Sequence, residues 1–210
     1  MKTKLSKKRA ISTVLTTVII LVSSVVLGSG VVLYGTSLFQ GGTQTEAITI
    51  NQISVWVDAA DSYGLGIGWG ALSVRNTGDT TVSVDRIIVR GADIPHTQWY
   101  SDTDVTTAIF QQALNHTGWE NPGTNVRMIS NCATDTTYLS IDPDGDGVGD
   151  CITADAGSGP VSMNPGQSAV IYFKLNNNTI TSLDSGVSTT VSIFAGKAGG
   201  PQSVTVIGKE

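Results

Sequence analysis

The sequence predicts an α+β protein in which a long, apolar N-terminal helix precedes an antiparallel β-sandwich. No charged residue occurs between Arg9 and Glu46, which is the pattern of a helix that lies in an apolar environment. From Ile48 onward, apolar and polar residues alternate with a period of two, as they do in half-buried strands. Gly accounts for 24 of the 210 residues, and turn signals that contain Gly or Pro separate the strand-like segments.

The charges are segregated along the chain. Five of the 12 basic residues precede Ala10, whereas the other seven share the rest of the chain with all 17 acidic residues. The net charge is −5 for the whole sequence and therefore −10 for the part after Arg9. An acidic body with scattered arginines cannot bind nucleic acid by neutralising phosphates, so we expect no nucleic-acid partner.

Residues 11–39 form the core of the predicted helix. A helix of 29 residues extends about 44 Å, longer than the ~20 residues that cross a bilayer. The basic residues before it favour a cytoplasmic N-terminus and export of everything after Phe39. The apolar core of a cleaved secretory peptide is about half as long, although Gly28-Ser29-Gly30 would suit its cleavage site. A plain retained membrane anchor is the simpler alternative.

The order of elements at the N-terminus indicates a third kind of segment. Lys8-Arg9-Ala10-Ile11-Ser12 places a basic pair and a small residue before the apolar run. This resembles the class III signal peptide of type IV pilins and archaellins. The resemblance implies cleavage between Ala10 and Ile11 by a prepilin peptidase, after which the helix first anchors the subunit and then packs into a filament core. Bacterial type IV pilins usually carry glutamate where this chain has Leu15, so the archaeal branch fits better.

The resemblance also gives an expected organisation. A leader peptide (1–10) precedes the transmembrane and filament-core helix (11–40), a linker (41–46) and the exported β-sandwich domain (47–210). Hydroxyl side chains in such a helix are tolerated because they can bond back to the preceding turn. Ser24 and Gly28 form a small-xxx-small pair that suits close helix contact. The hydroxyl residues are Thr13, Thr16, Thr17, Ser23, Ser24 and Ser29.

The exported body contains short strand candidates separated by turns. Ile48–Val57 reads as one strand with a kink or as two strands, and the histidines His96 and His116 read as surface loop residues. The stretches VRNTGDTTVSVDRIIVRG and MNPGQSAVIYFKL resemble the Ig-like domains of archaeal pilins and other surface proteins. The other predicted strands are 71–75, 81–90, 168–175, 189–195 and 203–208, and the predicted turns are 76–79, 164–166 and 199–201.

The run DPDGDGVGDCIT carries a calcium-loop motif. Carboxylates occupy positions 1, 3, 5 and 9 of an EF-hand-like loop, and glycine occupies position 6. The loop resembles those of dockerins and thrombospondin type 3 repeats, but position 12 is Thr153 instead of a bidentate carboxylate. An acidic turn without metal is the alternative. The predicted ligands of a structural Ca²⁺ are Asp142, Asp144, Asp146, Asp150 and the backbone carbonyl of Val148.

Other exported-protein chemistry follows from two cysteines and two sequons. Cys132 and Cys151 are predicted to form a disulfide, because two cysteines and distant histidines supply too few ligands for a metal–thiolate site. Asn115 and Asn177 each begin an Asn-x-Thr sequon that allows N-glycosylation. We find no constellation of catalytic residues and expect no enzymatic activity.

Two function classes remain. The first is a pilin or archaellin, a structural subunit of an archaeal type IV pilus-like filament for adhesion or motility. Its partners would be other copies through residues 11–39, the membrane before assembly, and the prepilin peptidase and assembly machinery. The second is a membrane-anchored extracellular β-domain that serves as an adhesin, envelope or archaellum accessory component. A secreted calcium-binding enzyme is disfavoured because catalytic residues are lacking.

Overall fold

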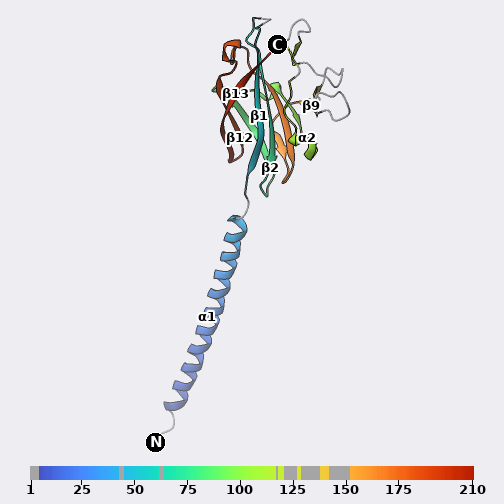
Figure 1. The fold of residues 1–210 in the computed structure, drawn as a ribbon. Coiled ribbons are helices and arrows are strands. Elements are labelled where there is room, and N and C mark those ends of the chain that lie inside the picture. The colour runs from blue at the N-terminus through green and yellow to red at the C-terminus, as the bar shows by residue number, and fades with distance from the viewer. Residues whose placement is uncertain are drawn as a thin grey trace. The chain divides into compact units, whose positions relative to one another are not determined.

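The computed structural model divides the chain into two compact units, Met1–Gln44 and Thr45–Glu210. The first unit is helical and the second is rich in strands (Figure 1). The residues that the structure describes are 5–42, 45–61, 64–116, 118–120, 127–128, 138–141 and 152–210.

Helix α1 spans Leu5–Gly42 and thus includes the whole predicted helical segment. Val, Ile and Thr, which are abundant in it, have only modest helix propensity because their χ1 freedom is restricted in a helix. In an apolar environment this preference matters little, because a helix satisfies its backbone hydrogen-bonding groups within one segment. An apolar N-terminal helix followed by a strand-rich unit confirms the α+β class.

The second unit is built on an 11-stranded sheet. Its strands follow the order β10-β3-β12-β13-β1-β2-β11-β5-β9-β8, and β4 pairs with β3. The strands are β1 (Ile48–Asp58), β2 (Gly68–Asn76), β3 (Val82–Val89), β4 (Ala92–Asp93), β5 (Trp99–Asp102), β8 (Tyr138–Ile141), β9 (Ile152–Ala156), β10 (Val161–Met163), β11 (Ser168–Lys174), β12 (Ser188–Ala195) and β13 (Ala198–Lys209). A two-stranded sheet contains β6 (Trp119–Glu120) and β7 (Arg127–Met128), and the helical segments are η1 (His96–Gln98), α2 (Thr107–Gln111) and η2 (Ser182–Asp184).

The sheet is mixed, so the prediction of a wholly antiparallel sheet is wrong at one pair of strands. β1 runs antiparallel to β2 but parallel to β13, with Val55 opposite Val206. Residue alternation determines the face on which each side chain lies, but it does not determine the direction of the neighbouring strand. The pattern of apolar residues therefore could not reveal this pairing.

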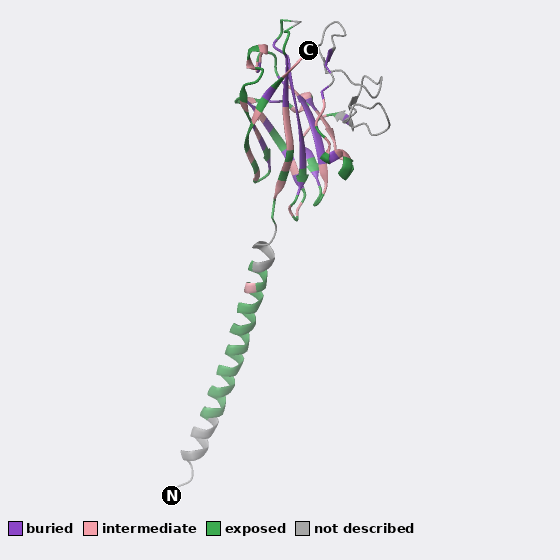
Figure 2. Cartoon of the chain, viewed as in Figure 1, coloured by how far each residue is buried: buried purple, intermediate pink, exposed green. Residues whose placement is uncertain are grey.

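Strand β13 connects the two halves of the sheet. Its residues Ala198–Thr205 pair with β12, and its residues Val206–Lys209 pair with β1. The sheet curls, so that strands far apart in its order face a shared interior (Figure 2). This inner core includes Val84 of β3, Leu72 of β2 and Phe173 of β11, each 0% exposed.

A second apolar cluster lies on the opposite face of β1, β2 and β11. We call it the outer aromatic cluster, and its members on the sheet side are Trp56, Ile67, Trp69, Ala71, Ala154, Val170 and Tyr172, against which Trp119 packs from the covering segment. Residues 103–116 and 118–120, here called the outer cover, run over this face and contain α2. Val105, Ile109 and Leu114 of the outer cover pack against the cluster. The segment is thus held on the sheet by apolar burial as well as by hydrogen bonds.

The predicted strands are confirmed at their centres. The kink in β1 is a register shift between Ile50 and Gln52. The predicted turns at 76–79 and 164–166 are also present, and the Gly78 N–H donates to Asn76 Oδ1 at 2.9 Å. The predicted turn at 199–201 is wrong, because those residues belong to β13 and the chain reverses between Ala195 and Ala198. The short strands β5, β8, β9 and β10 were not predicted, since three to five residues give too little alternation to recognise.

Candidate functional site

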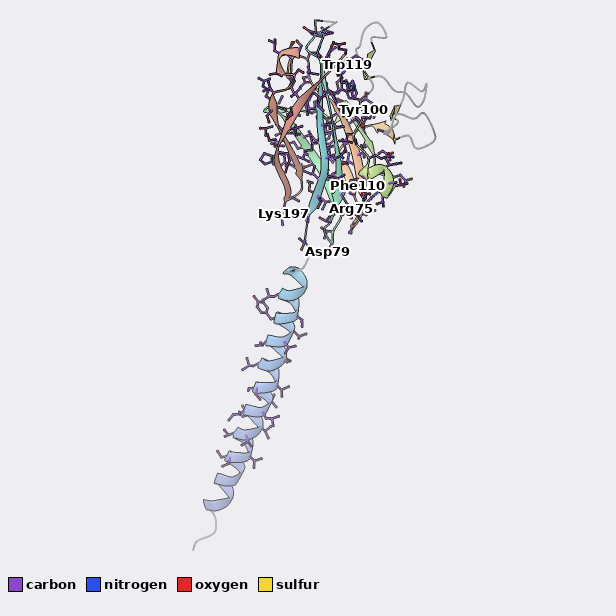
Figure 3. All side chains as sticks on the ribbon, in the orientation of Figure 1. Arg75, Asp79, Tyr100, Phe110, Trp119 and Lys197 are labelled. Carbon is purple, nitrogen blue, oxygen red and sulfur yellow. The ribbon has the colours of Figure 1, made fainter. Side chains whose placement is uncertain are left out.

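The side chains of α1 form the most extensive apolar surface among the described residues. Fifteen large apolar side chains between Val14 and Leu38 are each 53–72% exposed within the chain. They project from every side of the helix, as Figure 3 shows, and no charged residue interrupts them. A contiguous apolar surface of this size must be covered by lipid, by other helices or by both.

Several hydroxyl groups of α1 are satisfied within the helix. The Thr16 hydroxyl donates to the Ser12 carbonyl at 2.8 Å, and Thr17 donates to Val14 at 2.9 Å. Ser24 and Ser29 donate to the carbonyls of Leu21 at 2.8 Å and Val26 at 3.0 Å. The predicted back-bonding is therefore confirmed for these four residues, and their hydroxyls present no unsatisfied group to an apolar neighbour.

The length and hydropathy of α1 suit a membrane. Residues Ser12–Leu38 form a 27-residue segment with a mean hydropathy of 2.3. At 1.5 Å per residue it extends about 40 Å, enough to cross the roughly 30 Å hydrocarbon core with some tilt. The helix is thus a candidate membrane anchor or signal sequence by length and composition.

The predicted processing site lies inside the observed helix. Ala10 and Ile11 are the sixth and seventh residues of α1, but their side chains are outside those that the structure describes. Cleavage between these two residues stays a prediction.

The predicted calcium ligands and both cysteines lie outside the described residues. The strands on either side of the calcium run are described, and they pair in antiparallel. Ile141 at the end of β8 is the register partner of Ile152 at the start of β9. The residues that enter and leave the run 142–151 are therefore held next to each other. Among the described residues, no group of three or more His, Cys, Asp or Glu side chains could hold a metal ion.

The two sequon asparagines have different surroundings. Asn177 is exposed in the turn that follows β11. Asn115 is half-buried in the outer cover, and its backbone carbonyl accepts a hydrogen bond from the Tyr172 hydroxyl at 3.2 Å. Asn177 is the more accessible of the two glycosylation candidates.

The prediction that both histidines are surface residues is wrong for His116. This side chain is 1% exposed and lies against the rings of Trp56 and Trp119, at centroid distances of 5.2 and 4.4 Å. Burial and, to a smaller extent, the charge of Lys209 lower the pKa of His116 to about 3. His96 is half-exposed, and its Nε2 lies 2.9 Å from the carbonyl oxygen of Asp85. The sequence around His116 gives no signal of its burial, which depends on a tryptophan 60 residues earlier in the chain.

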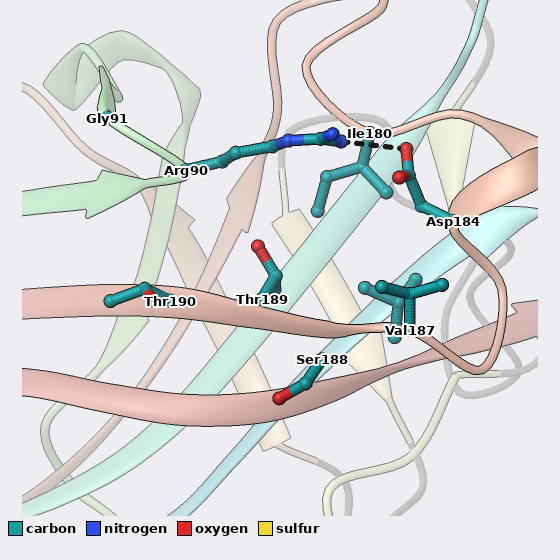
Figure 4. A pocket seen from close by; sticks show the side chains of 9 residues that line it. Arg90, Gly91, Ile180, Asp184, Val187, Ser188, Thr189 and Thr190 are labelled. Carbon is teal, nitrogen blue, oxygen red and sulfur yellow. Dashed lines mark ion pairs between the residues drawn. The ribbon is translucent and has the colours of Figure 1, made fainter.

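A cavity of about 400 Å³ lies where η2 meets the β3–β4 turn (Figure 4). Arg90 has a positive φ of 51° in that turn, and its Nη1 lies 2.9 Å from Asp184 Oδ2. Asp184 also accepts hydrogen bonds from the N–H and the hydroxyl of Thr181, which together with Arg90 lower the pKa of its carboxyl. Arg90 and Asp184 thus satisfy each other and tie the turn to η2, which is a structural role.

Comparison with known proteins gives no family assignment: no protein-family model and no curated protein matches this sequence.

Proposed function

We propose that the protein is a structural subunit, a pilin or archaellin, of an archaeal type IV pilus-like surface filament. The observation that carries this proposal is the exposed apolar surface on all sides of α1. Before assembly, lipid covers that surface. In the filament, the helices of neighbouring copies cover it, and each copy supplies the same apolar surface to its neighbours.

The N-terminal sequence supports maturation by a prepilin peptidase. The basic pair Lys8-Arg9 and the small Ala10 precede the apolar run, so cleavage before Ile11 removes the charged leader and keeps the helix. A leader with five positive charges would be costly to bury in a filament core. Its removal therefore belongs to the same proposal as assembly, and the assembly machinery is the second partner that it implies.

The strand-rich unit is the exported, solvent-facing part in this proposal. We assign its curled sheet to the Ig-like class, with the calcium run as an insertion between β8 and β9. The pairing of Ile141 with Ile152 supports a compact loop in which Asp142, Asp144 and Asp146 converge on Ca²⁺. A disulfide between Cys132 and Cys151 would restrain the same region.

The second candidate function is a membrane-anchored extracellular β-domain. Ser12–Leu38 is long and apolar enough to serve as an anchor by itself, with lipid as its permanent cover. In that case the protein remains as isolated copies in the membrane, and no N-terminal processing is needed.

Electron microscopy of filaments sheared from host cells separates the two functions. For a filament subunit, mass spectrometry of the purified filaments should identify this chain as a stoichiometric component. Recovery of the chain only from the membrane fraction, with filaments absent from cells that express it, would favour the anchored domain.

A further inference from the structure

We propose that His116 is an acid-sensitive latch, whose protonation releases the outer cover from the outer aromatic cluster while the inner core stays folded. The inference is independent of whether α1 assembles into filaments, because the latch lies wholly within the strand-rich unit.

The imidazole of His116 is held in its neutral form by its surroundings. The Gly118 N–H donates to Nδ1 at 3.0 Å, so Nδ1 is an acceptor and the ring proton lies on Nε2. Nε2 is buried and has no hydrogen-bond partner among the residues that the structure describes. The ring is packed at tilted angles of 47° to Trp56 and 61° to Trp119. His116 thus connects the cover to β1 through ring contacts that require an uncharged side chain.

Protonation would break this arrangement. A second proton must go to Nδ1, which can then no longer accept the hydrogen bond from the Gly118 N–H. The Nδ1–H and the Gly118 N–H are then two donors that face each other. The charged or titratable side chains on β1, β2, β11 and β13 are Asp58, Arg75, Tyr172, Lys174 and Lys209. Of these, Lys209 opposes the imidazolium. Aromatic faces attract cations by about 0.5–2 kcal/mol, yet burial outweighs that attraction and the pKa falls to about 3.

Four further hydrogen bonds join residues 110–119 of the cover to the neighbouring strands, and their groups do not titrate between pH 3 and pH 7; at the start of the cover, the Asp104 N–H donates to Asp102 Oδ1 at 2.8 Å. The four bonds involve amide, phenol and indole groups. Acid therefore acts on the contacts of residues 110–119 through His116 and not through these four bonds, whereas the inner core consists of apolar side chains. These bonds are Asn51 Nδ2 to the Phe110 carbonyl (3.1 Å), the Leu114 N–H to Gln52 Oε1 (3.1 Å), the Tyr172 hydroxyl to the Asn115 carbonyl (3.2 Å) and Trp119 Nε1 to the Lys209 carbonyl (3.1 Å).

The direction and size of the effect follow from the two pKa values. The pKa of His116 is about 3 with the cover closed and 6.5, its ordinary value, with the cover open. The closed form is therefore fully favoured above pH 6.5 and loses stability as the pH falls towards 3. Between pH 7.5 and pH 4.5 the opening equilibrium should rise on the order of 100-fold.

Native-state hydrogen exchange on the full-length chain in detergent tests the latch. After correction for intrinsic exchange rates, amides of the cover, such as those of Phe110 and Leu114, should lose about 100-fold protection between pH 7.5 and pH 4.5. Amides of the inner strands β2, β3 and β12 should keep theirs. The variant His116→Phe should abolish the pH dependence, and the matched variant His96→Gln should preserve it.

Three results would overturn the proposal: cover amides without pH dependence, an equal loss of protection in the inner strands, or an unchanged acid response in His116→Phe. Should His116→Phe fail to fold, an NMR titration of the wild-type His116 ring decides the question. A ring that stays neutral down to about pH 4 supports the latch, and a pKa near 6.5 refutes it.

Discussion

Replacing Val22 with aspartate tests whether α1 drives assembly. Val22 lies near the middle of the helix and is 54% exposed within the chain. Full burial of an aliphatic side chain contributes ~1.5–3 kcal/mol, so covering ten residues that are each about 0.6 exposed contributes roughly 9–18 kcal/mol per subunit. An unpaired carboxylate at this depth costs ~3–5 kcal/mol. Because tenfold in an equilibrium constant is 1.4 kcal/mol, the subunit concentration needed for assembly should rise roughly 100- to 4,000-fold.

The assay is electron microscopy of filaments on host cells that express Val22→Asp at the wild-type level. The variant Val22→Thr is the matched control, since its hydroxyl can bond back to the preceding turn as Thr16 and Thr17 do. A second control, Leu183→Asp, introduces the same charge at a residue of the strand-rich unit that is 89% exposed. Both controls should form filaments. Normal filaments from Val22→Asp would refute the assignment of assembly to an apolar helix core.

Three further predictions concern maturation and the calcium region. Mass spectrometry of the protein from its host should find a mature chain that starts at Ile11, and an intact Met1 terminus would contradict class III processing. The exported part should bind Ca²⁺ with a Kd on the order of 10⁻⁴–10⁻³ M, because position 12 of the loop lacks a bidentate carboxylate. Titration calorimetry should show a heat of calcium binding that is lost in an Asp144→Ala, Asp146→Ala variant. Identical titrations of the two proteins would argue against the site. Cys132 and Cys151 should be bridged across the 18 residues between them, with a contribution of about 3 kcal/mol, and alkylation without reductant should therefore label neither thiol.

The elements with strong periodicity were predictable from the sequence. The helix was recognisable because an uncharged run of this length must satisfy its backbone groups within one segment. Strands β1, β3 and β12 were recognisable because one face of each packs into the inner core, which produces alternation along the chain. Strands β2 and β11 are buried on both faces and were recognisable as short apolar runs bounded by turns. The kink in β1 was likewise visible, since the two apolar runs that flank Asn51 are out of phase.

The features that depend on contacts between distant segments were not predictable. His116 is buried because Trp56 and Trp119 lie on either side of it, and neither neighbour changes the local sequence pattern. The extension of β13 through Pro201 was missed because Gly and Pro usually mark turns. That strand tolerates the proline because Ser192, its register partner, lies on one edge, while no described residue pairs with the other edge at this point.

The unpaired edges of β1 and β13 bear on whether the strand-rich unit assembles by itself. Among the described residues, β13 pairs with β1 only from Val206 onward, so Ile48–Ser54 and Ala198–Thr205 lack a ladder partner on their facing edges. Such edges can template pairing with another chain.

Two features oppose that pairing, so we expect the strand-rich unit to stay monomeric without α1. The bulge between Ile50 and Gln52 interrupts the regular edge of β1. In β13, the Val206 N–H donates to the carbonyl of Val187, which directly precedes β12. Successive residues of a strand present their backbone N–H and C=O groups to opposite edges, so residues an odd number of positions from Val206 present theirs to the edge away from β12. Pro201 therefore withholds an N–H at the free edge. A chain that starts at Thr43 should sediment as a soluble monomer with its sheet intact. Polymers of that truncated chain would assign assembly to the sheet edge instead of the helix.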